Sequence, residues 1–191
     1  RVHGIDISAG SISVAQAHSA STFNKEQMQN LTYTVGNAYN LPLESQYADV
    51  IIMSDVLEHL DDLPKALAEV KRVLKPGGVF LFDTFNRTFL SWFFGIFGAQ
   101  LLLGIVPNHC HDWDLFIKPN ELDILLENND IRIQHLSGFD VWFNPFYLLW
   151  SKFTGNRLPM HFSLVNSLSV QYIGQAVKLK ENLVPLSKDP S

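Results

Sequence analysis

Residues 48–85, ADVIIMSDVLEHLDDLPKALAEVKRVLKPGGVFLFDTF, contain the pattern that decides the fold. The run at 48–53 is rich in β-branched side chains, which favours a strand buried on both faces of a parallel sheet. Residues 63–78 repeat apolar side chains at helical spacing, and we expect Pro76 and the Gly-Gly pair after it to end that helix. VFLFDTF at 79–85 is a second apolar strand. Strands that alternate with helices predict an α/β fold with a mostly parallel sheet.

The flanking segments continue this alternation. Ser8 is a suitable cap for a helix that would follow the first strand, and Pro119 stands near the start of a later helix. Residues 181–191 are polar, and we expect them to form a disordered tail. Outside the central stretch we therefore expect strands at 2–7, 31–35, 131–142 and 168–179 and helices at 8–21 and 118–129.

Length, charge and cysteine content limit the class of protein. A chain of 191 residues can bury one real core. Its net charge of -5 argues against a nucleic-acid partner, because phosphate binding needs a basic surface. The only cysteine, Cys110, excludes an internal disulfide framework and suits a reducing compartment.

Polar residues follow the first two expected strands. Asp6 ends the first strand and can accept hydrogen bonds from a ribose diol, as an acidic residue does in dinucleotide-binding folds. A strand-terminal Asp also commonly caps a turn or helix. Residues 36–42 form a polar loop where adenine lies in such folds, although Gly and Asn also form ordinary turns. Each feature by itself leaves both interpretations open.

The segment 54–60, SDVLEHL, carries the densest group of reactive side chains. Asp55, Glu58 and His59 stand at positions i, i+3 and i+4, so on a helical turn they would share one face. Two carboxylates and an imidazole form a reasonable ligand set for a divalent cation. The alternative is that the acidic residues only complement the dipole at the start of a helix.

The order and spacing of these features resemble those of the class I S-adenosylmethionine-dependent methyltransferases. In that family VLEHL follows the fourth strand and LKPGG precedes the fifth, and the likeness here covers roughly residues 2–84. It implies a Rossmann-like sheet with an antiparallel late strand, and S-adenosylmethionine as cofactor. The resemblance gives a cofactor-binding role to Asp6 and Ile7 at the ribose, to Asn37 and Ala38 near the adenine, and to Ser54.

The second half resembles the ubiquinone-biosynthesis O-methyltransferases, which methylate ring hydroxyls of polyprenylated catechol-like intermediates. NRTFLSW at 86–92, His111-Asp112 and FIKPNEL at 116–122 match the pattern of that family. Residues 108–110, Asn-His-Cys, replace its usual Lys-Gly-Thr, and Asp55 replaces a usual Glu. These departures leave room for a relative with a different lipid-like substrate.

The resemblance also implies how the reaction would proceed. Asp55, Glu58 and His59 would hold Mg²⁺ or another divalent cation, which would lower the pKa of the substrate hydroxyl and orient it. Without a metal, His59 would be the best general base, with Glu58 beside it and His111 as a secondary candidate. For His111 the alternative is a histidine packed beside Trp113.

Residues 88–106 contain no charged side chain and are crowded with Phe, Leu and Ile. The length is at the lower limit for a membrane span, but glycines and a glutamine interrupt it, and it lies between a strand and a helix of one domain. We expect two short helices at the membrane interface, with Trp92 and the Phe cluster in the headgroup region. They would form an apolar lid at 87–117, and the alternative is a lid packed over the sheet.

By the same resemblance, the family's glycine-rich loop and central strand would lie before Arg1. We therefore expect an N-terminally truncated domain over residues 1–180 that binds the cofactor poorly. The expected partners are a lipophilic small-molecule substrate, membrane lipid and other quinone-biosynthesis proteins. The expected location is intracellular, peripheral on the bacterial cytoplasmic membrane or on the matrix side of the mitochondrial inner membrane. Two alternatives stay open: a methyltransferase for another small lipophilic acceptor, and a non-catalytic membrane-associated scaffold.

Overall fold

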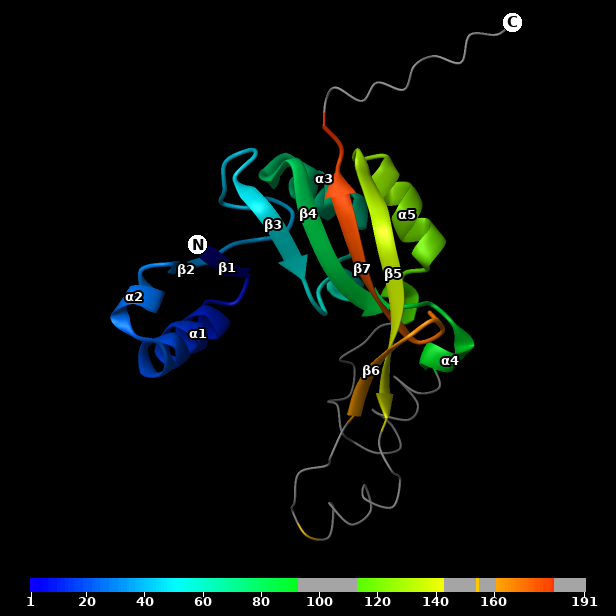
Figure 1. Ribbon diagram of the computed structural model, residues 1–191, viewed down its shortest axis with the longest axis horizontal. Helices are drawn as coiled ribbons and strands as arrows, with labels where there is room; N and C mark the ends of the chain where they lie inside the picture. The colour runs from blue at the N-terminus through cyan, green and yellow to red at the C-terminus, as the bar shows by residue number, and fades with distance from the viewer. Residues whose placement is uncertain (93–112, 143–153, 155–160, 181–191) are drawn as a thin grey trace, which may run out of the picture.

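The strands form two sheets (Figure 1). The computed structural model describes residues 1–92, 113–142, 154 and 161–180. In the first sheet, β1 (Val2–Asp6) pairs in parallel with β2 (Leu31–Val35). The second sheet has the order β3-β4-β7-β5-β6, with β3 at Ala48–Met53, β4 at Leu74–Phe85, β5 at Ile131–Trp142, β6 at His161–Val165 and β7 at Gln171–Lys178.

The α/β class is confirmed in a mixed sheet, and β7 is the antiparallel late strand that the resemblance implied. β3 and β4 are parallel, whereas β4–β7, β5–β7 and β5–β6 are antiparallel. β6 was not expected from the sequence. Residues 166–170 carry the chain from β6 on one edge of β5 to β7 on the other, so both strands run opposite to β5. Hydrophobic alternation identifies a strand but does not encode its direction.

The central strand–helix–strand unit is confirmed, with one change of boundary. α3 (Leu63–Val73) begins after Asp62, whose carboxylate accepts a hydrogen bond from the Lys65 N–H at 3.2 Å. The helix ends at Val73, before it reaches the expected stop at Pro76, because Leu74 is already extended and starts β4. Pro76 and Gly77 therefore belong to the strand, where Gly77 adopts φ +80°.

The remaining helices range from a single turn to the 14 residues of α1. Ser8 caps α1 (Ala9–Thr22) as expected, since its hydroxyl accepts from the Ser11 N–H at 3.2 Å. α5 (Pro119–Glu127) also starts at the expected proline. The expected tail at 181–191 lies outside the described residues. The other elements are α2 at Lys25–Met28, α4 at Phe89–Ser91 and the 3₁₀ helices η1 at Leu57–His59 and η3 at Trp113–Leu115.

The core lies between the second sheet and the pair α3 and α5, which cover one of its faces (Figure 1). Tyr172 is fully buried there, and its hydroxyl donates to the Ile117 carbonyl oxygen at 3.0 Å. No helix within the described ranges is both long and apolar enough to cross a bilayer. The fully buried apolar members of the core include Leu57, Leu67, Val70, Leu74, Phe80, Leu122, Leu126 and Ile131.

Candidate functional site

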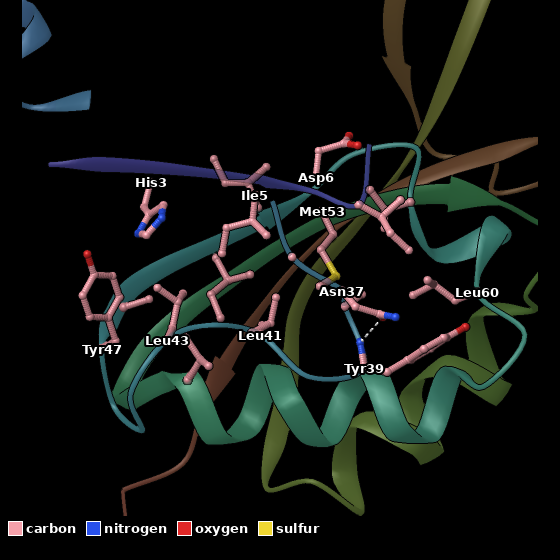
Figure 2. Close-up of a pocket in the computed structure, with 18 of the residues that line it drawn as sticks. His3, Ile5, Asp6, Asn37, Tyr39, Leu41, Leu43, Tyr47, Met53 and Leu60 are labelled. Carbon is pink, nitrogen blue, oxygen red and sulfur yellow. Dashed lines mark hydrogen bonds between the residues drawn. The ribbon is translucent and has the colours of Figure 1, made fainter. Parts of the chain in front are cut away.

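A cavity of about 1070 Å³ lies between β1 and β3 (Figure 2). β1 contributes alternate side chains, His3 and Ile5, which fall on one side of a strand because strand residues alternate between faces. The polar rim comes from the carboxyl end of β1, from the loop after β2 and from the turn after β3. The cavity is lined there by Asp6, Ile7, Asn37, Ala38, Tyr39, Asp55 and His59.

Asp6 ends β1, forms a turn with its carboxylate and also lines the cavity. Its Oδ1 accepts the Ser8 N–H at 2.7 Å, which fixes the turn into α1. The same carboxylate lines the cavity, as does the strongly exposed Ile7 beside it. A carboxylate has about four lone-pair sites, so the bond to Ser8 leaves it able to accept further hydrogen bonds.

The loop after β2 is a compact turn that faces the cavity. Asn37 accepts the Tyr39 N–H through its Oδ1 at 2.9 Å, and its carbonyl oxygen accepts the Asn40 N–H at 3.0 Å (Figure 2). Gly36 lies so close to β1 that an added Cβ would approach Ile5 to 2.8 Å. Asn37 and Ala38 therefore line the cavity beside the end of β1, while they also build the turn.

The expected shared face of Asp55, Glu58 and His59 does not form. Asp55 adopts a left-handed conformation at φ +50°, and η1 after it is a single 3₁₀ turn rather than an α-helix. A 3₁₀ helix has three residues per turn, so positions i+3 and i+4 diverge. Glu58 is fully buried and points to β4, where it accepts the Thr84 hydroxyl at 2.9 Å. Asp55 and His59 instead line the cavity.

The three side chains consequently do not make one ligand set for a divalent cation. Within the described part of the chain, no three His, Cys, Asp or Glu side chains gather closely enough to hold a metal ion. Carboxylate and imidazole groups would suit such an ion chemically. Here the three side chains lie apart, because Glu58 is buried in the core whereas Asp55 and His59 line the cavity.

Burial raises the pKa of Glu58 from 4.5 to about 7. The negative charges of Asp55 and Asp83 contribute to this increase of the pKa, while hydrogen bonds to the backbone and to Thr84 oppose it. Asp83 also accepts the Asp55 N–H at 3.1 Å, which supports the left-handed turn. Asp83 was not singled out from the sequence. Its position near the carboxyl end of β4 could have indicated it, because parallel β3 and β4 end at the same edge of the sheet.

Other expected site residues fall elsewhere. Ser54 is exposed directly after β3 but is not among the residues that line the cavity. His111 and most of the expected lid at 87–117 lie outside the described residues. The sequence did not single out the aromatic lining residues. These are Tyr39, Tyr47 and His3, whose Nε2 lies 2.7 Å from the Thr34 hydroxyl oxygen.

Comparisons with known proteins bear on this arrangement. Residues 1–82 match a family model described as a methyltransferase domain. A SAM-dependent methyltransferase from Methanosarcina mazei superposes with a TM-score of 0.58 at 20% identity, over 94% of this chain and 82% of that one. One from Aquifex aeolicus gives 0.58 at 15% identity, over 94% and 69%. The fold is that of a class I methyltransferase.

The sequence of this chain is also similar to curated proteins that are each named ubiquinone biosynthesis O-methyltransferase, mitochondrial. The protein from Dictyostelium discoideum is 30% identical over 93% of this chain and 53% of its own length. The protein from Mus musculus is 34% identical over 84% of this chain and 43% of its own length. The resemblance inferred from the second half of the sequence is thus confirmed. The chain spans about half the length of these relatives.

Proposed function

We propose that the chain belongs to an S-adenosylmethionine-dependent O-methyltransferase that acts on a ring hydroxyl of a lipophilic, catechol-like quinone precursor. One observation carries the proposal. In a methyltransferase fold, a single cavity is lined by the carboxylate at the end of β1, the Asn37–Ala38 turn and the imidazole of His59. The names of the curated relatives support the quinone precursor as substrate.

The nucleoside end of the cofactor would occupy the β1 side of the cavity. Asp6 would accept hydrogen bonds from the ribose hydroxyls, and Ile7 would contact the same sugar. Asn37 and Ala38 would lie along the adenine, where the turn is already held by its own hydrogen bonds. Ser54 is exposed just after β3 but does not line the cavity, so its contact with the cofactor stays a prediction.

Proton transfer would fall to His59. When bound, S-adenosylmethionine supplies the methyl group to be transferred. The exposed imidazole of His59 faces the cavity and would take the hydroxyl proton from the substrate. Glu58 does not line the cavity, so we assign it to positioning η1 through its bond with Thr84. His111 stays a prediction, and no step is assigned to a cation.

One further strand would complete the sheet between β1 and β3. Each of these strands has a single partner among the described strands. Val50 and Ile52 of β3, which line the intervening cavity, are 50% and 68% exposed. Unpaired strand edges readily accept another strand. An added β-branched peptide should protect those β3 amides that do not bond to β4 from hydrogen exchange. Unchanged exchange would contradict this strand.

A methyl-transfer assay tests the function. The measurement is transfer of label from S-adenosylmethionine to a short-chain prenyl catechol. We expect His59→Ala to lower kcat about 10²-fold or more, as loss of a general base does, with little change in cofactor affinity. Asp6→Ala should instead weaken cofactor binding. His135→Ala is the matched control, because His135 is exposed on β5 and bonds only locally to Ser137. Full activity in His59→Ala would contradict the assignment of the base.

A further inference from the structure

Residues 41–46 connect the cavity-facing turn to β3 without forming a strand or helix. They are attached instead to α3, which runs alongside them (Figure 2). Leu41 and Leu43 from this segment line the cavity together with Tyr39. The position of the segment therefore depends on hydrogen bonds between its backbone groups and residues of α3.

Glu69 and Arg72 supply those contacts. The Leu41 N–H donates to Glu69 Oε2 at 2.7 Å. Arg72 donates from Nη2 to the Leu41 carbonyl oxygen at 3.0 Å and from Nη1 to the Leu43 carbonyl oxygen at 2.7 Å. The Gln46 N–H donates to the Arg72 carbonyl oxygen at 2.8 Å. Two residues one helical turn apart thus bind the segment at three positions.

The pair is itself rigid. Arg72 Nε donates to Glu69 Oε1 at 2.7 Å and Nη2 donates to Oε2 at 2.7 Å, so the guanidinium holds the carboxylate with two parallel bonds. The side chains are only 32% and 15% exposed. A planar guanidinium can serve a carboxylate and two carbonyls at once, whereas a Lys ammonium is a point charge on a flexible stem.

The first turn of α3 holds the other end of the loop. Tyr39 accepts the Asp62 N–H through its hydroxyl at 3.2 Å, and Lys65 Nζ lies 5.8 Å from the centre of the Tyr39 ring. Tyr39 in turn donates its N–H to Asn37. Contacts from both ends of α3 therefore converge on the turn that faces the cavity.

We propose that Glu69 and Arg72 are positioning residues that hold the loop of residues 37–43 in the geometry that binds the nucleoside of the cofactor. This inference rests on the proposed function. The pair makes no part of the apolar face by which α3 packs on the sheet, which consists of Ala66, Leu67, Val70 and Val73. Its loss should therefore affect the loop more than the fold.

The experiment compares Arg72→Lys and Glu69→Gln with the unaltered protein by calorimetric titration of S-adenosylmethionine. Arg72→Lys keeps the positive charge but removes the planar guanidinium that donates several hydrogen bonds at once. Glu69→Gln keeps an acceptor for the Leu41 N–H but removes the ion pair with Arg72. Each should weaken cofactor affinity about tenfold, the size expected for a lost charge-assisted hydrogen bond. The KM for S-adenosylmethionine should rise, while kcat and the KM for the methyl acceptor stay within twofold.

Lys71→Gln is the control, because its ammonium pairs with Asp130 at 2.6 Å rather than with the loop. It should keep the affinity of the unaltered protein. Hydrogen exchange at the Leu41 amide should accelerate in both test variants and not in the control. Unchanged cofactor affinity in both test variants would overturn this inference alone. Failure of the unaltered protein to bind S-adenosylmethionine even weakly, with the peptide for the strand between β1 and β3 supplied, would overturn the proposed function first, and the positioning role with it.

Discussion

At the residue scale, one short turn sends neighbouring reactive groups into different surroundings. The left-handed Asp55 is fixed by the carboxylate of Asp83, and the single turn of η1 follows at once. Glu58 therefore enters the core beside Thr84, while His59 reaches the cavity. Burial raises the pKa of the Glu58 carboxyl to about 7, whereas the His59 side chain is exposed at the cavity. The two groups suit different tasks for this reason.

The raised pKa of Glu58 predicts a specific pH dependence of stability. Its pKa moves from 4.5 to about 7 on folding, so the folded state binds more protons between these values. Stability from this group is full below pH 4.5 and is lost as the pH rises to about 7. Glu58→Gln should remove that loss and raise the free energy of unfolding at pH 8 by on the order of 3 kcal/mol relative to its effect at pH 4.5. Urea unfolding at the two pH values measures this.

Glu44→Gln is the control for that comparison, because Glu44 is exposed in the loop before β3. It removes the same charge without removing a buried carboxyl, so its effect should be nearly the same at both pH values. If Glu58→Gln and Glu44→Gln change stability by the same amount at both pH values, the raised pKa of Glu58 is wrong.

At the scale of elements, the sequence predicted those features that local chemistry determines. The apolar runs of β3 and β4, the cap at Ser8 and the proline that starts α5 were all read correctly. The turn at Asp55 could not be predicted, because its left-handed backbone depends on Asp83, which lies 28 residues away along the chain. The antiparallel direction of β7 was implied by the family resemblance, whereas β6 was missed, because its pairing depends on the path of the chain rather than on side-chain pattern.

The crossing from β6 to β7 depends on Gly138 of β5. A Cβ at this position would lie 1.8 Å from the Ser167 carbonyl oxygen, so the connection must pass over a residue without a side chain. Gly138→Ala should lower the free energy of unfolding by about 3 kcal/mol, because a backbone group would have to move. Gly10→Ala in α1 is the matched control, since its Cβ would meet only Ser8 Oγ at 3.5 Å. It should be neutral or stabilising by about 0.5 kcal/mol. Equal effects in urea unfolding would contradict the crossing.

At the scale of the whole molecule, the two sheets contribute opposite walls of the proposed active site. The end of β1 and the loop after β2 would hold the nucleoside, while the turn after β3 would carry the catalytic base. Sequence reasoning found residues on both walls because each follows a strand, where polar side chains stand out against apolar runs. It did not find Glu69 and Arg72, because a Glu–Arg pair on a helix ordinarily indicates a solvated face. Only the path of the loop beside α3 gives this pair a role.

The proposed substrate has a consequence for the whole molecule, because the polyprenyl chain of such a substrate would partition into membrane. Phe89, Leu90, Trp92 and Trp113 are exposed around α4, and Phe89 stacks on Trp92 at 5.7 Å between ring centroids. Aromatic side chains of this kind favour the membrane interface. We therefore infer that this end of the molecule contacts lipid.

The double variant Phe89→Ser/Trp92→Ser should lower co-sedimentation with anionic phospholipid vesicles at least fivefold, because each buried aromatic side chain contributes about 1 to 2 kcal/mol of partitioning free energy. Ile124→Ser is the control: Ile124 is 59% exposed on α5, away from α4 in the sequence, and should leave sedimentation unchanged. Activity toward a water-soluble catechol should persist in the double variant, since neither residue lines the cavity. If the double variant sediments as the unaltered protein does, lipid contact through α4 is excluded. The proposed lipophilic methyl acceptor would then have to reach His59 by another route.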